Sequence, residues 1–271
     1  FSGKDDRLIY PANYAINAGK NAPVLTNTRE GYGYTANVTV NATPVKNLDI
    51  MAAYTRTESK EISGLPGSDP LSTWQGLISV DGPNQAKLQR SQYVVPNKVI
   101  ASISYFLPFE TMYGKGLHLN LFYTGMTPYG YSYCYANDMN GDGINNDLMY
   151  IPANKGDIKF VSAADEDKFF AFMEQDSYLK NHKGQYAEAY AARAPWVNRF
   201  DFRIAEDIAF KTGNSVHNFQ ISLDAMNIGN MINSAWGVYK NNAICNSSRV
   251  LKYEGMDANN VPTFSMGDYT Q

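Results

Sequence analysis

Apolar and polar residues alternate in six separate segments of this chain. In the first segment Tyr34, Val38 and Val40 fall on one side, while Asn37 and Thr39 fall on the other. A period of two residues is typical of a β-strand that has one apolar face and one polar face. The same alternation predicts strands at about 32–42, 48–57, 98–107, 117–126, 198–210 and 217–227, preceded by a loop over 1–31.

The connections between these strands alternate in length. Short links follow the first, third and fifth strands, whereas long loops cover 58–96, 127–197 and 228–271. Short turns at one end and long loops at the other are typical of outer-membrane barrels. In an ordinary compact domain, loops this long would count against the strand assignment. The pattern predicts an all-β fold, an antiparallel transmembrane β-barrel with long extracellular loops that contain short helices.

Aromatic residues gather near both ends of the predicted strands. With the long loops outside, the outer group is Tyr32, Tyr34, Tyr54, Tyr123 and Phe200, and the inner group is Tyr105, Phe210 and Phe219. Two aromatic bands are expected where a barrel meets the two lipid–water interfaces. Glu206 interrupts the apolar side of the fifth strand. A carboxylate at this place is consistent with a membrane barrel only if it lies near a lipid–water interface. The alternative is a secreted β-sandwich whose aromatic side chains fill a core.

Composition narrows the function classes. Lys and Arg total 23 against 26 Asp and Glu, so the net charge is −3 and the cationic surplus of a nucleic-acid binder is missing. No stretch approaches the roughly 18 apolar residues of a membrane-spanning helix. Six strands are fewer than the roughly eight of the smallest membrane barrels, so the chain is predicted to be part of a larger one. The cysteines, Cys134 and Cys245, form either one disulfide or two thiols.

The loop over 127–197 contains two segments with helical spacing. Phe169, Phe172 and Met173 recur at such intervals between Ser162 and about residue 180, and Ser162 with Asp165 is an N-cap signature. A second helical piece is predicted over 186–193, before a proline.

A calcium-loop motif precedes the first of these helices. Asp138, Asn140, Asp142 and the following glycine match the pattern D-x-[DN]-x-[DN]-G, whose alternate oxygen ligands suit a hard cation. Position twelve is Met149 instead of the usual Glu. The predicted ligands are Asp138, Asn140, Asp142, Ile144 through its backbone carbonyl, Asn146 and Asp147. The alternative is a metal-free turn held by side-chain to backbone hydrogen bonds.

Four aromatic residues of the long loops are candidates for ligand contact. Trp74, Tyr129, Tyr131 and Tyr133 are expected to stack on a sugar or a peptide, or else to pack the loops internally.

Catalytic signatures are missing from the sequence. The three histidines, His118, His182 and His217, lie on separate segments without metal-ligand spacing. The chain has no G-x-S-x-G sequence, no Walker A motif and no Rossmann fingerprint. We therefore expect that the protein is not an enzyme.

Four segments together resemble one protein family. The run 138–152, DMNGDGINNDLMYIP, is similar to the long-loop signature of the Oar-like TonB-dependent receptors of Gram-negative outer membranes, which are related to SusC-like receptors. The segments 179–186, 193–201 and 224–233, the last followed by Trp236-Gly237, resemble the final part of the same family.

The resemblance implies a 22-stranded barrel around an N-terminal plug, of which this chain is the C-terminal part without the plug. Such barrels end in an aromatic residue, and Gln271 does not match that ending. The implied function is energised uptake across the outer membrane of a ligand such as a glycan, a peptide or a metal chelate. The implied partners are TonB-ExbB-ExbD, acting through the absent N-terminal region, outer-membrane lipid and, in some branches, a surface lipoprotein. Some members export proteins, so the direction of transport stays open.

A second function class is also consistent with the residues. A secreted or surface module that binds or adheres in a calcium-dependent way, without transport, would need the calcium loop but no lipid-facing strands.

Overall fold

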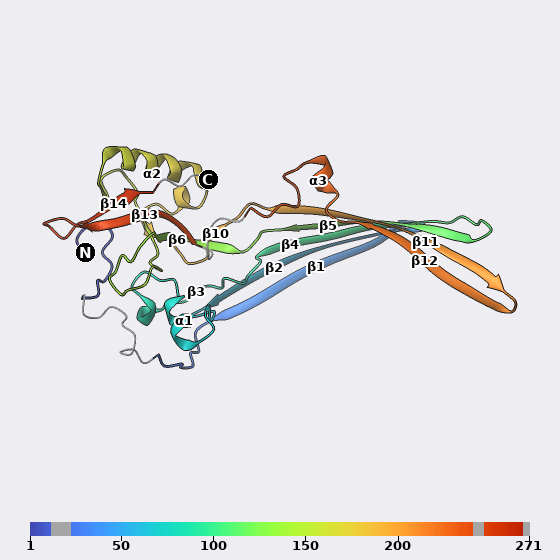
Figure 1. Cartoon of the computed structure of the whole chain (residues 1–271), viewed down its shortest axis with the longest axis horizontal. Coiled ribbons are helices and arrows are strands. Elements are labelled where there is room, and N and C mark those ends of the chain that lie inside the picture. The colour runs from blue at the N-terminus through green and yellow to red at the C-terminus, as the bar shows by residue number, and fades with distance from the viewer. Residues whose placement is uncertain (12–22, 241–246, 268–271) are drawn as a thin grey trace.

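A computed structural model describes residues 1–11, 23–240 and 247–267 of the chain. The molecule is elongated, with one long antiparallel sheet and a compact body at one end of it (Figure 1). We call this body the loop module; it comprises residues 1–11, 62–88, 91–96, 127–196 and 247–267. Among the residues described, no helix is both long enough and apolar enough to cross a membrane.

The long sheet contains all six strands that the alternation predicts. They pair in the order β1-β2-β4-β5-β11-β12, every neighbour antiparallel, with the short β3 (Gln89–Arg90) beside β2. The bounds are β1 Tyr32–Val45, β2 Leu48–Glu61, β4 Asn97–Leu107, β5 Gly114–Met126, β11 Val197–Thr212 and β12 Ser215–Ala225. The antiparallel all-β class is therefore confirmed.

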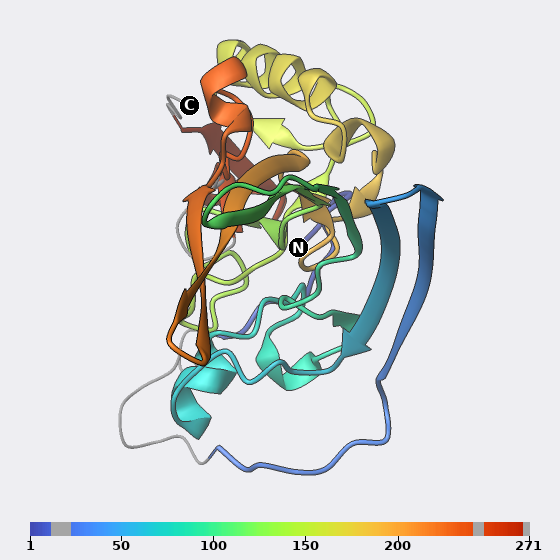
Figure 2. The same ribbon diagram turned by 90° about the vertical axis from the view of Figure 1, so that its right-hand side faces the viewer.

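The sheet is curved but open. Figure 2 looks along the long axis and shows the strands as an arc from β1 on the right to β12 on the left. Both of these strands are edges of the sheet, because each pairs on one side only within the described part of the chain. These strands do not close into a barrel, so a 22-stranded barrel stays a prediction.

Strand register gives the sheet one apolar face and one polar face. Residues paired directly across strands point to the same face, whereas neighbours along a strand point to opposite faces. One row of paired residues is Leu48, Tyr105, Leu119, Ile204 and Leu223. The adjacent row is Asp49, Ser104, Asn120, Arg203 and Asp224. We call the two sides the apolar face and the polar face.

All the short links lie at the end of the sheet away from the loop module (Figure 1). Asn47 in the first link and Gly213 in the third adopt left-handed backbone conformations, with φ of 67° and 61°. Asn and Gly tolerate this conformation best, which is why they form tight hairpin turns. The long connections meet at the opposite end and build the loop module.

The loop module is more regular than its sequence indicates. Its mixed sheet has the order β10-β6-β13-β14-β8, and β7 pairs with β9. The bounds are β6 Gly130–Tyr135, β7 Tyr150–Ile151, β8 Lys159–Phe160, β9 Gln185–Tyr186, β10 Ala192–Arg193, β13 Ser247–Met256 and β14 Pro262–Met266. The helices and 3-10 turns are α1 Pro70–Gln75, η2 Pro83–Gln85, α2 Ala163–Gln175 and η3 Leu179–Asn181, with α3 Gly229–Ile232 outside the module. The predicted long loop over 228–271 contains α3, β13 and β14 in its described part.

One of the two predicted helices is present. The side chain of Ser162 accepts a hydrogen bond from the backbone N–H of Asp165 and caps α2, which confirms the first prediction. The second was wrong, because 186–193 is extended at both ends and Tyr190 has a φ of 54°. Alanines favour a helix there, but pairing with β7 and β6 overrides that local preference.

The hydrophobic core lies in the loop module. Its largest fully buried side chains include Tyr133, Tyr135, Phe169, Leu251 and Phe264. All six residues of β6 are buried, so this strand is covered on both faces and shows no alternation that its sequence could reveal.

Candidate functional site

The calcium-loop motif lies between β6 and β7, against the core of the loop module. Four of its polar residues are buried, namely Asn140, Asp142, Asn146 and Asp147. Buried polar groups are stable only where hydrogen bonds or charges compensate them, so each of these side chains needs a partner.

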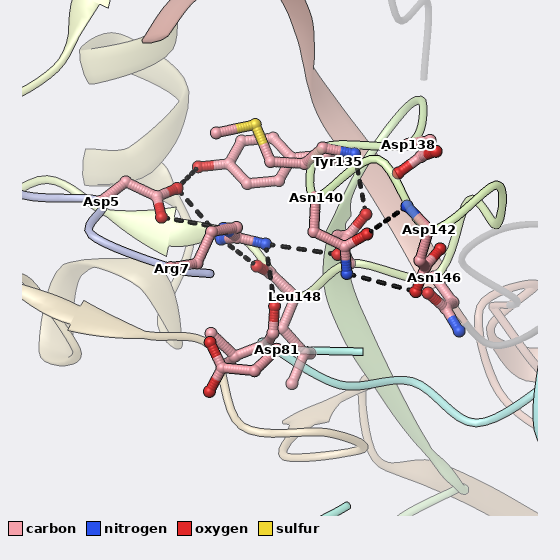
Figure 3. Close-up of polar contacts among 12 residues, drawn as sticks. Asp5, Arg7, Asp81, Tyr135, Asp138, Asn140, Asp142, Asn146 and Leu148 are labelled. Atoms are coloured by element: carbon pink, nitrogen blue, oxygen red, sulfur yellow. Dashed lines mark hydrogen bonds and ion pairs between the residues drawn. The ribbon is translucent and has the colours of Figure 1, made fainter. Parts of the chain in front are cut away.

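Side-chain to backbone hydrogen bonds curl the loop. The carboxylate of Asp138 accepts the N–H groups of Gly141 and Gly143, both at 2.7 Å. The side-chain oxygen of Asn140 accepts the N–H of Asp142 at 2.8 Å, and Oδ1 of Asp142 accepts the N–H of Ile144 at 2.8 Å. These contacts are the side-chain to backbone turns of the metal-free alternative, and Figure 3 shows the side chains of Asp138, Asn140 and Asp142 that accept them. They also hold the side chains of Asp138, Asn140 and Asp142 within one short loop.

Asn146 joins this loop to the segment that follows α1. Its Nδ2 donates to the backbone oxygens of Gln75 at 3.2 Å and Leu77 at 2.7 Å. Its Oδ1 is buried and has no hydrogen-bond partner among the described residues. An unpaired buried amide oxygen costs about 1–3 kcal/mol, so this atom marks a place for a ligand.

Asp147 faces a different set of groups. Its Oδ2 accepts the N–H of Met139 at 2.8 Å, and its Oδ1 lies 3.6 Å from Nη1 of Arg7, within ion-pair range but too far for a hydrogen bond. Burial raises the pKa of Asp147 to about 7, an effect that the charge of Arg7 opposes.

Arg7 is the centre of a buried network that the sequence analysis missed. Its Nε and Nη2 donate to both carboxylate oxygens of Asp5, at 2.8 and 3.0 Å, and Nη2 also donates to the carbonyl of Leu148 at 2.7 Å (Figure 3). The guanidinium lies over the ring of Tyr135, 4.8 Å from its centroid. Asp5 and Arg7 belong to the expected loop over 1–31, where an Asp-x-Arg pair was the only signal in a segment without periodicity.

Like charges gather at the motif. The pKa of Asp142 is raised by burial and also by the nearby negative charge of Asp138. Both of these carboxylates also raise the pKa of Asp147. Arg7 pairs with Asp5 and Asp147. In the described structure, the carboxylates of Asp138 and Asp142 therefore have no cation within hydrogen-bond or ion-pair distance.

The four aromatic candidates do not share one role. Tyr131 and Tyr133 are buried, and Tyr133 stacks on Tyr178 with ring centroids 5.9 Å apart, so these residues pack the module, which was the alternative role. Tyr129 is half-buried immediately before β6. Trp74 is half-buried on α1 and donates its indole N–H to Asn84 at 2.8 Å.

The remaining candidate chemistry is dispersed. His118 pairs with Asp207 at 2.7 Å on the polar face, and His182 stacks on Tyr178 inside the module. Nowhere in the described ranges do three Asp, Glu, His or Cys side chains converge to hold a metal by themselves. Cys134 is buried as a free thiol, and Cys245 lies outside the described residues.

No known protein family matches the chain, and no curated protein or solved structure is similar to it.

Proposed function

We propose that this chain forms part of the wall and the outer loops of a TonB-dependent transporter in the outer membrane of a Gram-negative bacterium. One observation carries the proposal. The sheet has an apolar face opposite a polar face, and every long connection lies at one end of it. The resemblance of four segments to Oar-like receptors supports the same function from the sequence.

The apolar face needs a solvent other than water. Val40, Ile221 and Leu223 are 62%, 65% and 69% exposed, although all three belong to the apolar rows of the sheet. Monomeric soluble proteins rarely expose contiguous apolar patches larger than a few hundred Å². A sandwich would cover this face with a second sheet, and the other two sheets of the described residues are in the loop module instead. Lipid is therefore the environment that suits the apolar face.

The polar face suits a water-filled lumen. Arg203 and Asp224 lie 3.7 Å apart on it, and His118 pairs with Asp207 farther along the same strands. In the proposed protein, further strands would extend the sheet from β1 and β12 into a 22-stranded barrel around a plug. TonB-ExbB-ExbD would act on that plug, and the lumen would carry a glycan, a peptide or a metal chelate.

Aromatic residues on the apolar face fit two lipid interfaces. Tyr123 and Phe200 pack together toward the loop module, with ring centroids 4.9 Å apart, whereas Phe210 and Phe219 stack near the short links. Glu206, the exception in the apolar pattern, lies beside Gly114 at the inner end of β5. That position is near the proposed inner interface, where a carboxylate costs least.

The test compares neighbouring positions on β4. Ile103→Cys on the apolar face and Ser104→Cys on the polar face each receive a spin label, in the full chain reconstituted in lipid vesicles with Cys245→Ser as background. The proposal expects the label at 103 to collide with lipid-soluble oxygen and the label at 104 to collide with a water-soluble nickel complex. Equal access of both labels to nickel, with a chain that stays monodisperse without detergent, would refute the membrane wall and favour a secreted or surface calcium-dependent binding module.

A further inference from the structure

We infer that the loop over 138–146 is a Ca²⁺ site. The ligands are the side-chain oxygens of Asp138, Asn140, Asp142 and Asn146, with the backbone carbonyl of Ile144. The inference does not rest on the transporter function, because it depends only on contacts inside the loop module.

The first argument is charge. Asp142 is buried, and its carboxylate shares one short loop with that of Asp138, with no cation within ion-pair distance of either carboxylate among the described residues. Gly141 and Gly143, with φ of 78° and 90°, allow the tight curl that brings the two side chains to the same loop. A divalent cation would neutralise both carboxylates at once.

The second argument is the unpaired oxygen of Asn146. Its residue is 5% exposed, and both hydrogen bonds of its Nδ2 point away toward Gln75 and Leu77. Oδ1 has no hydrogen-bond partner among the described residues, and in Figure 3 the side chain of Asn146 lies beside that of Asp142. A carboxylate and an amide oxygen cannot satisfy each other, because both only accept hydrogen bonds. A cation between them satisfies both.

The third argument concerns which oxygens remain available. The N–H of Ile144 occupies one lone pair on Oδ1 of Asp142, and the only hydrogen bond that Oδ2 receives from a described residue is a 3.3 Å contact from Nδ2 of Asn140. Backbone N–H groups likewise hold Asp138 and Asn140 in orientation without using all of their acceptor capacity. Such contacts orient the ligands before the ion arrives.

The donor set selects the ion. All five ligands are oxygens, two of them charged, which suits Ca²⁺. Zinc and copper are disfavoured, because they prefer sulfur and imidazole ligands. Amide and carbonyl oxygens at irregular spacing suit the flexible coordination of Ca²⁺ better than the rigid octahedron of Mg²⁺. With only two carboxylates, we expect a dissociation constant of about 10⁻⁴ M, the range of extracellular calcium modules. Asp147 stays with Arg7 and is not a ligand.

The ion would connect three segments of the chain. Asn146 is bonded to the segment after α1, and the carbonyl of Asn140 accepts the N–H of Tyr10 at 2.6 Å. Bound calcium would therefore hold residues 1–11 and the region after α1 against the loop, and chelation should loosen all three together.

The experiment measures binding of the metal alone. Terbium, which occupies oxygen-rich calcium sites, is added to the full chain, and its emission is excited through nearby tyrosines such as Tyr10. We expect a saturable signal that Ca²⁺ displaces and Mg²⁺ does not, and slower proteolysis of the loop in Ca²⁺ than in chelator. Asp142→Asn keeps the shape and the acceptor for the N–H of Ile144 but loses one charge, and should weaken Ca²⁺ binding roughly tenfold or more.

The matched control is Asp157→Asn. Asp157 also holds a loop of the module, by accepting the N–H groups of Ala153 and Asn154 at 2.9 Å, but lies outside the motif. The Asp157→Asn variant should bind Ca²⁺ with an affinity within twofold of that of the unchanged chain. If Asp142→Asn does not fold, Asp138→Asn replaces it. A full chain that gives no displaceable terbium signal, or equal losses in the motif variant and the control, would overturn the site.

Discussion

The long sheet and the loop module use the same apolar residues in opposite ways. Leu223 on β12 is 69% exposed, whereas Leu251 on β13 is fully buried. Tyr54 and Tyr135 differ in the same manner, the first exposed on the sheet and the second buried under Phe264. The module thus supplies its own apolar environment, whereas under the proposed function lipid would supply that of the sheet. Four predictions test this difference, from the largest expected effect to the smallest.

Loss of Arg7 should damage the module most. Arg7→Ala leaves the carboxylates of Asp5 and Asp147 buried without their cation, and breaking a buried ion pair in this way costs about 3–5 kcal/mol. Because the module is then less stable, the backbone amides of β6 and β7 should exchange their hydrogens faster. Lys4→Ala, which removes an exposed cation from the same segment, is the control and should change exchange little. Equal exchange in both variants would contradict a structural role for Arg7.

Matched leucine truncations compare the two regions directly. Leu251→Ala should lower the free energy of unfolding of the module by about 2–5 kcal/mol, because it opens a cavity in a closed core. Leu223→Ala should cost less than about 1 kcal/mol, since lipid or detergent fills the space beside an exposed side chain. Denaturant titration in detergent measures both. Equal costs would mean that the apolar face is covered by protein.

A charge should distinguish the two faces of the sheet. Leu119→Arg places a cation on the apolar face and should destabilise the chain in vesicles by about 2–4 kcal/mol. Asn120→Arg puts the same charge on the polar face and should cost close to nothing. Reversible unfolding from lipid vesicles in urea measures the pair. A larger cost at 120 than at 119 would reverse the assignment of the faces.

The smallest effect concerns a thiol. Burial raises the pKa of Cys134 to about 12, so at pH 8 only about one thiol in 10⁴ is ionised, and alkylation of the folded chain should be very slow. Because the thiolate is the reactive form, the rate should rise with pH toward 12, and unfolding should restore ordinary reactivity at pH 8. The engineered thiol of Ser104→Cys on the polar face of the sheet should react much faster in detergent. Mass spectrometry after timed alkylation follows both, and fast labelling of Cys134 in folded protein would contradict its burial.

The sequence predicted the long sheet well and the module poorly, for one physical reason. One face of the sheet carries apolar side chains and the other carries polar ones, so residues alternate and each strand can be predicted from its local sequence. In β6 both faces are covered, and β13 pairs with it in parallel from more than a hundred residues away, which removes the local signal. The N-cap of α2 was predictable because capping depends on residues three apart.

The sequence alone determined the strand positions, the two-faced sheet, the gathering of long connections at one end and the position of the calcium motif. These features depend on the spacing of near neighbours in the chain. Only the tertiary structure decided that Tyr131 and Tyr133 are core residues and that Asp147, one of the predicted ligands, pairs with Arg7. It also decided that Asn146 presents an unpaired buried oxygen to the motif. These outcomes depend on which distant segments pack together, and burial with its electrostatic cost arises only once they have done so.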